Sequence, residues 1–217
     1  MATRKVPLAI NEFYHVYQRG INKQPIFELD EDKTRFLLPI LASQSLKRIA
    51  NPSLLSLRYI KTRSFGFTQP IADDIATNRV VSLVSFCVMP NHFHIILQQL
   101  EDGGISQYMK RVLNSYAKYF NTKYDRSGHL FEKEFQAQHI SSNTQLLHTS
   151  AYIHRNPREL KGWAGNESRY EWSSFPDYTS LNRWGPLLDQ ATLLDQFKDS
   201  TDYVSFVNTS PAKNGFE

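Results

Sequence analysis

The sequence predicts an α+β fold of the ferredoxin-like type, in which helices pack on an antiparallel sheet. Two observations lead to this prediction. Segments with strand character are interleaved with amphipathic helical patterns. They follow one another as strand, helix, strand, strand, helix, strand, which is the order of a ferredoxin-like domain. A further helix and an irregular C-terminal stretch come after them.

The first half of the chain begins with a predicted strand at residues 12–18. Residues 30–48 read as a helix because acidic residues crowd its start and apolar residues recur at helical spacing. Pro39 lies inside this span and is expected to kink or divide the helix. Residues 50–78 are polar and irregular, with a short strand expected at 55–60.

Residues 80–88 are rich in β-branched and apolar side chains and predict a buried strand. The sequence Met89-Pro90-Asn91 interrupts that strand, because proline cannot donate to a central ladder and Pro-Asn favours a turn. Residues 92–99 then read as the second strand of a hairpin. Another strand is expected at residues 135–140.

The clearest helix covers residues 105–124, where apolar residues follow the i, i+3, i+4 pattern throughout. A third helix is expected at residues 142–156. Ser142 and Gln145 have the spacing of a capping box at its start, and Pro157 disfavours helical geometry in the residue before it. A short helical pattern recurs at residues 189–197.

A length of 217 residues favours one domain with an appendage. We expect the main domain at residues 1–160 and a wrapping extension, not an independent domain, at 161–217. The formal net charge of +4 is too small to identify a partner. Residues 186–217 hold five acidic and two basic residues, a net charge of −3, which leaves +7 on the rest. A site for a polyanion is therefore expected before Pro186.

The single cysteine, Cys87, excludes an intramolecular disulfide and a zinc site of several thiolates. No stretch approaches the roughly 18 apolar residues that a membrane span needs. The basic residues 1–10 lack an apolar signal region. We therefore expect a cytoplasmic protein that makes no contact with a membrane.

Two histidines, His92 and His94, occupy alternate positions of a predicted strand. Alternate side chains of a strand point to the same face, so both imidazoles project together while Phe93 points to the core. Two imidazoles in this arrangement can bind one divalent cation and leave positions open for a substrate. The alternative is a pair of solvated histidines on an exposed face.

Tyr152 lies in the predicted helix at residues 142–156. At about 100° per residue, Leu146, Ile153 and His154 share one side, which is expected to face the sheet. Tyr152 falls on the opposite, polar side, with Asn156 one turn beyond it. The alternative is an ordinary amphipathic tyrosine without a chemical role.

The polar face of the helix at residues 105–124 is basic, and the basic run continues beyond the helix. Interleaved tyrosines give this run the character of a surface that follows a phosphate backbone and stacks on bases. The alternative is a solvated charged face, because exposed charges contribute little energetically. The run consists of Lys110, Arg111, Lys118, Lys123, Arg126 and Lys133.

Four motifs together resemble those of the single-tyrosine HUH transposases, and specifically the branch of REP-associated tyrosine transposases. They occur in the family's order, at about its spacing, and cover roughly residues 12–160. The motifs are Phe13-Tyr14-His15-Val16-Tyr17-Gln18-Arg19-Gly20-Ile21-Asn22, Val88-Met89-Pro90-Asn91-His92-Phe93-His94, Ser127-Gly128-His129-Leu130-Phe131 and Tyr152-Ile153-His154-Arg155-Asn156-Pro157.

The resemblance implies a metal-dependent endonuclease and strand transferase that acts on single-stranded or hairpin DNA. His92 and His94 match the metal-binding histidines, with Mg²⁺ or Mn²⁺ as the expected metal, and Asn156 matches a polar residue that completes the metal shell. Tyr152 matches the nucleophile, which would form a 5′-phosphotyrosine and a free 3′-hydroxyl. Arg19 and Arg155 join the basic run as expected DNA contacts.

The residues fit this chemistry. An ordinary tyrosine has a pKa of about 10 and is a poor nucleophile at neutral pH. A metal at the histidines would offset charge that develops on the phosphate. No side chain stands out as a general base, although His148 lies one turn before Tyr152. The chain departs from the family at Glu132-Lys133-Glu134, where relatives often carry an arginine, so positive charge is lost near the expected DNA path.

Two other functions are compatible with the sequence. A DNA-hairpin-binding protein without cleavage would keep the fold and the basic face. A metal-dependent hydrolase of small phosphoesters would use water in place of Tyr152, but the chain lacks the clustered carboxylates that such a site favours. Either a monomer or a homodimer is expected, and a homodimer could complete one active site with a tyrosine from the second subunit.

Overall fold

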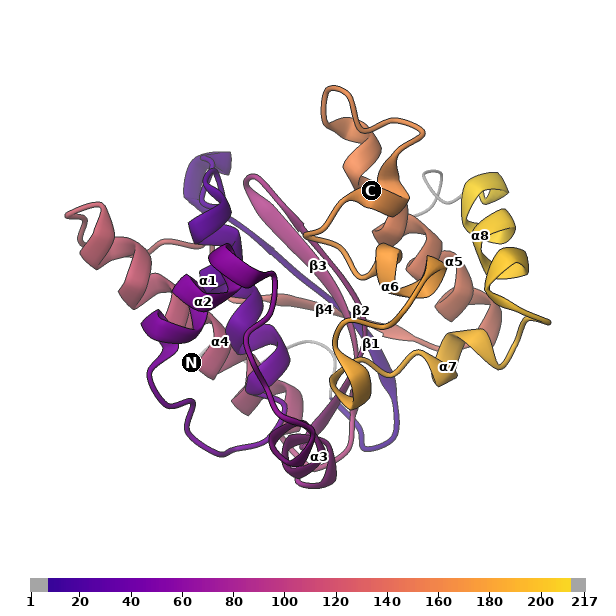
Figure 1. Ribbon diagram of the computed structural model, residues 1–217, viewed down its shortest axis with the longest axis horizontal. Coiled ribbons are helices and arrows are strands. Elements are labelled where there is room, and N and C mark those ends of the chain that lie inside the picture. Colours follow the sequence, from indigo (N-terminus) through magenta and orange to yellow (C-terminus); the bar gives the residue numbers. More distant parts are fainter. Residues whose placement is uncertain (1–7, 212–217) are drawn as a thin grey trace.

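The computed structural model describes residues 8–211 and has a four-stranded antiparallel sheet at its centre (Figure 1). The strands lie in the order β2-β3-β1-β4, which is the ferredoxin-like order, so the predicted fold class is confirmed. Residues 1–7 lie outside the described residues. So do Lys213 and Glu217, which were counted in the net charge of residues 186–217. The strands are β1 (Phe13–Arg19), β2 (Val81–Met89), β3 (His92–Gln99) and β4 (Gln136–Ile140).

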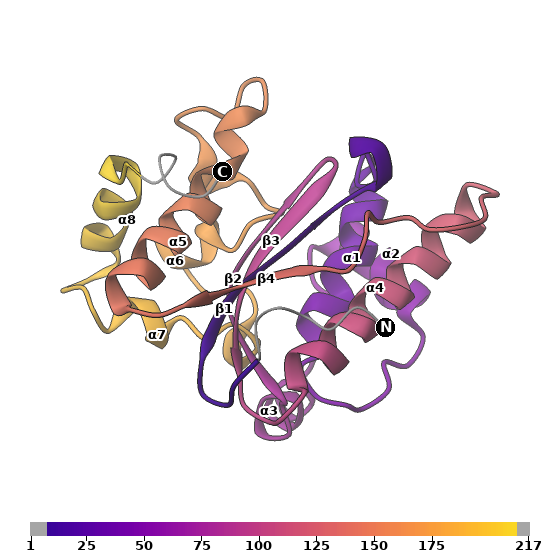
Figure 2. The same cartoon turned by 180° about the vertical axis from the view of Figure 1, so that it is seen from behind.

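Helices cover both faces of the sheet, and Figures 1 and 2 show the two helical layers on opposite sides of it. Within the described residues, no helix combines the length and the apolar character that crossing a membrane requires. The first layer contains α1 (Asp30–Ala42), α2 (Pro52–Thr62) and α4 (Gly104–Lys123), with α3 (Gln69–Thr77) beside it. The second contains α5 (Asn143–Arg155), α6 (Phe175–Thr179), α7 (Ala191–Leu194) and α8 (Ser200–Thr209). Short 3₁₀ turns occur at Ile21–Lys23, Asn156–Glu159, Glu167–Arg169 and Gly185–Leu187.

The main core lies between the sheet and the first layer. Phe93 on β3 is fully buried, and its ring centroid lies 4.9 Å from that of Phe36 on α1. Phe36 in turn packs at 5.1 Å against Tyr116 on α4. The prediction that Phe93 points to the core is therefore confirmed, and the other face of β3 is left for His92 and His94.

The C-terminal segment covers the outer edge of β2. Val88 N donates to Trp172 O and Ser174 N donates to Phe86 O, both at 2.9 Å. The segment thus satisfies backbone groups that an edge strand would otherwise expose. Every residue of β2 is buried, which explains why its sequence is apolar without alternation.

Three expectations about the segment between β1 and β2 are wrong. Residues 50–78 contain α2 and α3 in place of an irregular stretch with a strand at 55–60. Pro52 occupies the first turn of α2, where proline is favoured, and Tyr59 stacks on Phe65 with ring centroids 4.5 Å apart. The helix expected at 30–48 ends at Ala42, and Pro39 does not divide it.

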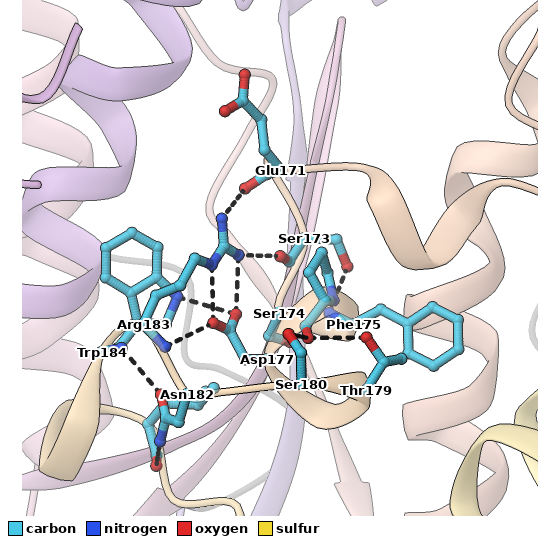
Figure 3. Close-up of polar contacts among 12 residues, drawn as sticks. Glu171, Ser173, Ser174, Phe175, Asp177, Thr179, Ser180, Asn182, Arg183 and Trp184 are labelled. Carbon is cyan, nitrogen blue, oxygen red and sulfur yellow. Dashed lines mark hydrogen bonds and ion pairs between the residues drawn. The ribbon is translucent and has the colours of Figure 1, made fainter. Parts of the chain in front are cut away.

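The C-terminal extension contains more regular structure than the sequence predicts. Its helices α6 and α8 have no counterpart among the predicted elements. A polar network fixes its centre. The carboxylate of Asp177 is fully buried and faces the guanidinium of Arg183, as Figure 3 shows. Arg183 Nε and Nη2 each donate to it at 2.8 Å, and Trp184 Nε1 donates at 3.0 Å.

Candidate active site

The two histidines of β3 lie beside three residues of β1 on one face of the sheet. In the antiparallel register Tyr17 is opposite His94 and Arg19 is opposite His92, and paired residues point to the same face. His15 follows on that face by the alternation of the strand. The ring centroids of His92 and His94 are 5.1 Å apart, so the expected juxtaposition of the two imidazoles is present.

The turn that precedes His92 is held by the loop after β1. Pro90 O accepts from Ile26 N and from Phe27 N, both at 2.9 Å, and Asn91 O accepts from Gly20 N at 2.8 Å. A Cβ on Gly20 would lie 2.6 Å from Gln24 O, so the close approach requires glycine.

Asn91 fixes the ring of His92. Its Nδ2 donates to Lys23 O at 2.9 Å, which leaves Oδ1 facing His92 Nδ1 at 2.6 Å. An amide oxygen only accepts hydrogen bonds, so Nδ1 of His92 carries the proton. The lone pair of His92 is therefore on Nε2, the nitrogen that remains for a ligand.

Tyr152 on α5 lies against the same cluster. Its ring centroid is 5.3 Å from that of His94 and 6.0 Å from that of His15, with edge-to-face geometry at both. The expectation that Tyr152 points away from the sheet is wrong. The physical reason is that α5 lies between the sheet and the C-terminal helices, so both of its sides are covered.

The side of α5 that was expected to face the sheet instead contacts the C-terminal helices. His154 is fully buried. Its Nε2 lies 2.9 Å from Ser174 Oγ and its Nδ1 lies 2.8 Å from the hydroxyl of Tyr203 on α8. The Tyr203 hydroxyl also donates to Ser150 Oγ at 3.1 Å. These bonds fix the rotation of α5 and so aim Tyr152 at the histidines.

Burial favours the neutral form of both histidines of β3. Burial lowers the pKa of His92, and the nearby positive charge of Arg19 lowers it further. Burial also lowers the pKa of His94 well below its usual value, with His15, His92 and Arg19 adding to the effect. A neutral imidazole has an unprotonated nitrogen that can bind a metal ion.

Asn156 follows Tyr152 by one helical turn, and its Nδ2 donates to Tyr152 O at 2.8 Å. Its side chain is also close enough to His92 to raise the pKa of that imidazole, against the larger effect of burial. Two neutral imidazoles and one amide fit a divalent cation that takes its remaining ligands from a phosphate and from water. Within residues 8–211 no cluster of three or more His, Cys, Asp and Glu side chains could hold a metal by itself.

The predicted basic contacts are divided between the two sides of the sheet. Arg19 is exposed on β1 next to His92, and Arg155 is on α5, where its Nη1 donates to Ser210 O. Lys110 and Lys118 are exposed on α4, in the layer on the other side of the sheet. Lys133 is exposed in the loop before β4.

Three further basic residues form contacts within the chain. Arg111 Nη1 donates to Ser45 O at 2.6 Å, and its Nη2 donates to Lys47 O. Lys123 Nζ forms ion pairs with Asp32 at 2.8 Å and with Glu31 at 2.9 Å. The guanidinium of Arg126 lies 5.6 Å from the ring centroid of Phe120. The role of the α4 residues in DNA binding stays a prediction.

His148, the suggested general base, contacts α8. Its Nδ1 lies 3.0 Å from Ser210 Oγ, and its ring packs at 5.3 Å against Phe206. The structure instead places His15 beside His94 and Tyr152. The sequence analysis assigns no role to His15. The signal was available, because His15 alternates with Tyr17 and Arg19 along a predicted strand.

Comparison with known proteins gives a family match and similarity to solved structures. Residues 59–156 match the model of the family described as "Transposase IS200 like", a range that contains His92, His94, Tyr152 and Asn156. Over this range the match agrees with the resemblance of the sequence motifs to transposases. No curated protein matches the chain. A solved structure of a REP-associated tyrosine transposase bound to a REP hairpin is 16% identical, with a TM-score of 0.47, over 81% of this chain and 84% of that one.

Proposed function

We propose that this chain, whose residues 59–156 carry the sequence pattern of IS200-like transposases, cleaves and rejoins single-stranded DNA beside a hairpin through a covalent bond to Tyr152. The observation that supports this proposal is the position of Tyr152. Its ring lies 5.3 Å from that of His94 within one chain. Tyr152, the proposed nucleophile, and the imidazoles of His92 and His94 therefore share one face of the sheet within one chain.

The proposed reaction is an exchange of phosphodiester bonds. The phenol oxygen of Tyr152 loses its proton and attacks phosphorus, while the bond from phosphorus to the 3′ oxygen breaks and that oxygen takes a proton. The products are a 5′-phosphotyrosine and a free 3′-hydroxyl. Attack by another 3′-hydroxyl reverses the step and joins strands, and no external energy source is needed because the number of phosphoester bonds is conserved.

The residues around Tyr152 would orient the phosphate and balance its charge. Arg19 lies near enough to lower the pKa of His92 and His94, so its guanidinium is positioned to attract a phosphate. Mg²⁺ or Mn²⁺ held by His92, His94 and Asn156 would supply further positive charge at the phosphate oxygens. The DNA substrate would be cytoplasmic.

The proposal is tested with the full chain and a DNA hairpin that has single-stranded flanks. One substrate carries a label at its 5′ end and the other at its 3′ end. With Mn²⁺ or Mg²⁺ we expect a denaturation-resistant adduct that carries the 3′ label and a released fragment that carries the 5′ label, and EDTA should abolish both. An adduct with the 5′ label would contradict the polarity, and binding without any adduct would contradict cleavage.

The position of the DNA is tested by comparing Arg19 and Arg111, because the sequence analysis predicts that both contact DNA. Arg19→Ala should weaken hairpin binding and lower the slope of log affinity against log salt by about one, the effect of losing one phosphate contact. Arg111→Ala should leave that slope unchanged, because its guanidinium already donates to carbonyls of Ser45 and Lys47. The opposite result, measured by fluorescence anisotropy, would place the DNA over α4.

A further inference from the structure

We infer that His15 is a positioning residue that holds His94 in one tautomer, with Nε2 of His94 unprotonated and available to a divalent metal ion at the site. The inference rests on the proposed function, because it concerns the same site. His15 is neither in the pair of histidines on β3 nor on the helix of Tyr152. It reaches the site from β1.

The contact between the two rings is direct. His15 Nε2 lies 2.9 Å from His94 Nδ1, and the two ring planes are inclined by 29° with centroids 5.0 Å apart. Both side chains are buried. A short hydrogen bond away from water restricts the rotation of His94 and leaves its other nitrogen, Nε2, as the atom for a ligand.

The contact itself limits the protonation of the pair. A hydrogen bond between two ring nitrogens needs one donor and one acceptor, so one proton lies between His15 Nε2 and His94 Nδ1. Two arrangements are possible, since either Nδ1 of His94 or Nε2 of His15 can donate. In the first, Nε2 of His94 has a lone pair, and in the second it carries a proton.

The matching arrangement at His92 favours the first. Asn91 Oδ1 accepts from His92 Nδ1, so His92 is held as the Nδ1–H tautomer with a lone pair on Nε2. If His15 Nε2 is the acceptor, then Nδ1 of His94 carries the proton and Nε2 has the lone pair, as in His92. Each histidine would then donate from Nδ1 to a neighbouring side chain. Metal-binding histidines commonly have such a partner on their second nitrogen, and its loss costs about 10- to 100-fold in metal affinity.

The tautomer is measured by NMR on the full chain labelled with ¹⁵N at histidine, without added metal. We expect the spectrum of His94 to show a protonated Nδ1 and an unprotonated Nε2, as that of His92 should. In His15→Leu, which has no acceptor, we expect His94 to become a mixture of tautomers. A protonated Nε2 on His94 in the parent protein would overturn the inference.

Mn²⁺ affinity, followed by electron paramagnetic resonance of the free ion, gives a second measurement. His15→Leu should bind Mn²⁺ about 10- to 100-fold more weakly than the parent. His15→Gln, which can place an acceptor near the position of Nε2, should restore most of the affinity. His139→Leu is the matched control, because His139 is a half-buried histidine on β4 that pairs with Glu12, so the affinity of this variant should equal that of the parent.

The outcomes separate this inference from the proposed function. If the parent binds Mn²⁺ and His15→Leu binds it equally well, with an unchanged His94 spectrum, His15 has no positioning role. If His92→Ala does not change Mn²⁺ binding, the proposed metal site is wrong, and the His94 tautomer still decides the role of His15. Thermal unfolding of each variant shows whether a loss reflects the site or the fold.

Discussion

The Tyr152→Phe protein is expected to form no covalent adduct with hairpin DNA while it binds that DNA as tightly as the parent does. The substitution removes one oxygen and keeps the ring that packs on His94 and His15. Because that oxygen is the proposed nucleophile, adduct formation should fall by at least about a thousandfold, the order of effect seen when a nucleophile is deleted. Denaturing gel electrophoresis measures the adduct, and fluorescence anisotropy measures binding.

A second tyrosine provides a demanding control. Tyr17 lies on the same face of the sheet, and its ring centroid is 5.7 Å from that of His94. Proximity to the histidines alone therefore does not distinguish the two hydroxyls. We expect Tyr17→Phe to retain the adduct, and peptide mapping should find the nucleotide on Tyr152.

Two results would contradict the assignment. An adduct that persists in Tyr152→Phe and disappears in Tyr17→Phe would make Tyr17 the nucleophile. Tight hairpin binding with no adduct in the parent, at any concentration of Mg²⁺ or Mn²⁺, would instead support a DNA-binding protein that does not cleave.

The Asp177→Ala protein is expected to be much less stable than the parent. Asp177 is fully buried and accepts hydrogen bonds from Arg183 and from the indole of Trp184 (Figure 3). Removing the carboxylate leaves the charge of Arg183 without its partner, which typically costs about 3–5 kcal/mol when a pair is buried. For a chain of this size we expect the melting temperature to fall by roughly 10 °C, as measured by circular dichroism.

Asp74→Ala is the matched control for this measurement. Asp74 forms an ion pair with Lys47, but both side chains are exposed. Exposed pairs contribute about 0–1 kcal/mol, so the melting temperature should change little. Equal effects of the two substitutions would show that the network around Asp177 does not stabilise the C-terminal segment.

The sheet could be predicted from the sequence because its strands carry local signals. Apolar and β-branched residues mark β2, the sequence Pro90-Asn91 marks the turn, and β3 begins at His92 as expected. The helix α4 was equally predictable, since its apolar stripe extends over many turns. Such patterns reflect the period of each element and need no knowledge of its neighbours.

Elements that depend on distant contacts could not be predicted in the same way. The helix α2 exposes Leu54 and Leu57 and buries Tyr59 against Phe65 and Trp184. Its stability therefore comes from tertiary contacts, with α1 and with the distant Trp184, and its own sequence shows little amphipathic pattern. Short helices commonly depend on tertiary packing in this way.

The sequence by itself determined the ferredoxin-like order of elements, the shared face of His92 and His94, and the family resemblance that singles out Tyr152. The tertiary structure alone decided which side of α5 meets the sheet, that Arg19 and not α4 borders the histidines, and that His15 contacts His94. The physical reason is that alternation and helical period are local properties of the backbone. Which surfaces meet is decided by packing between segments far apart in the chain, such as Tyr203 and Ser174 around His154.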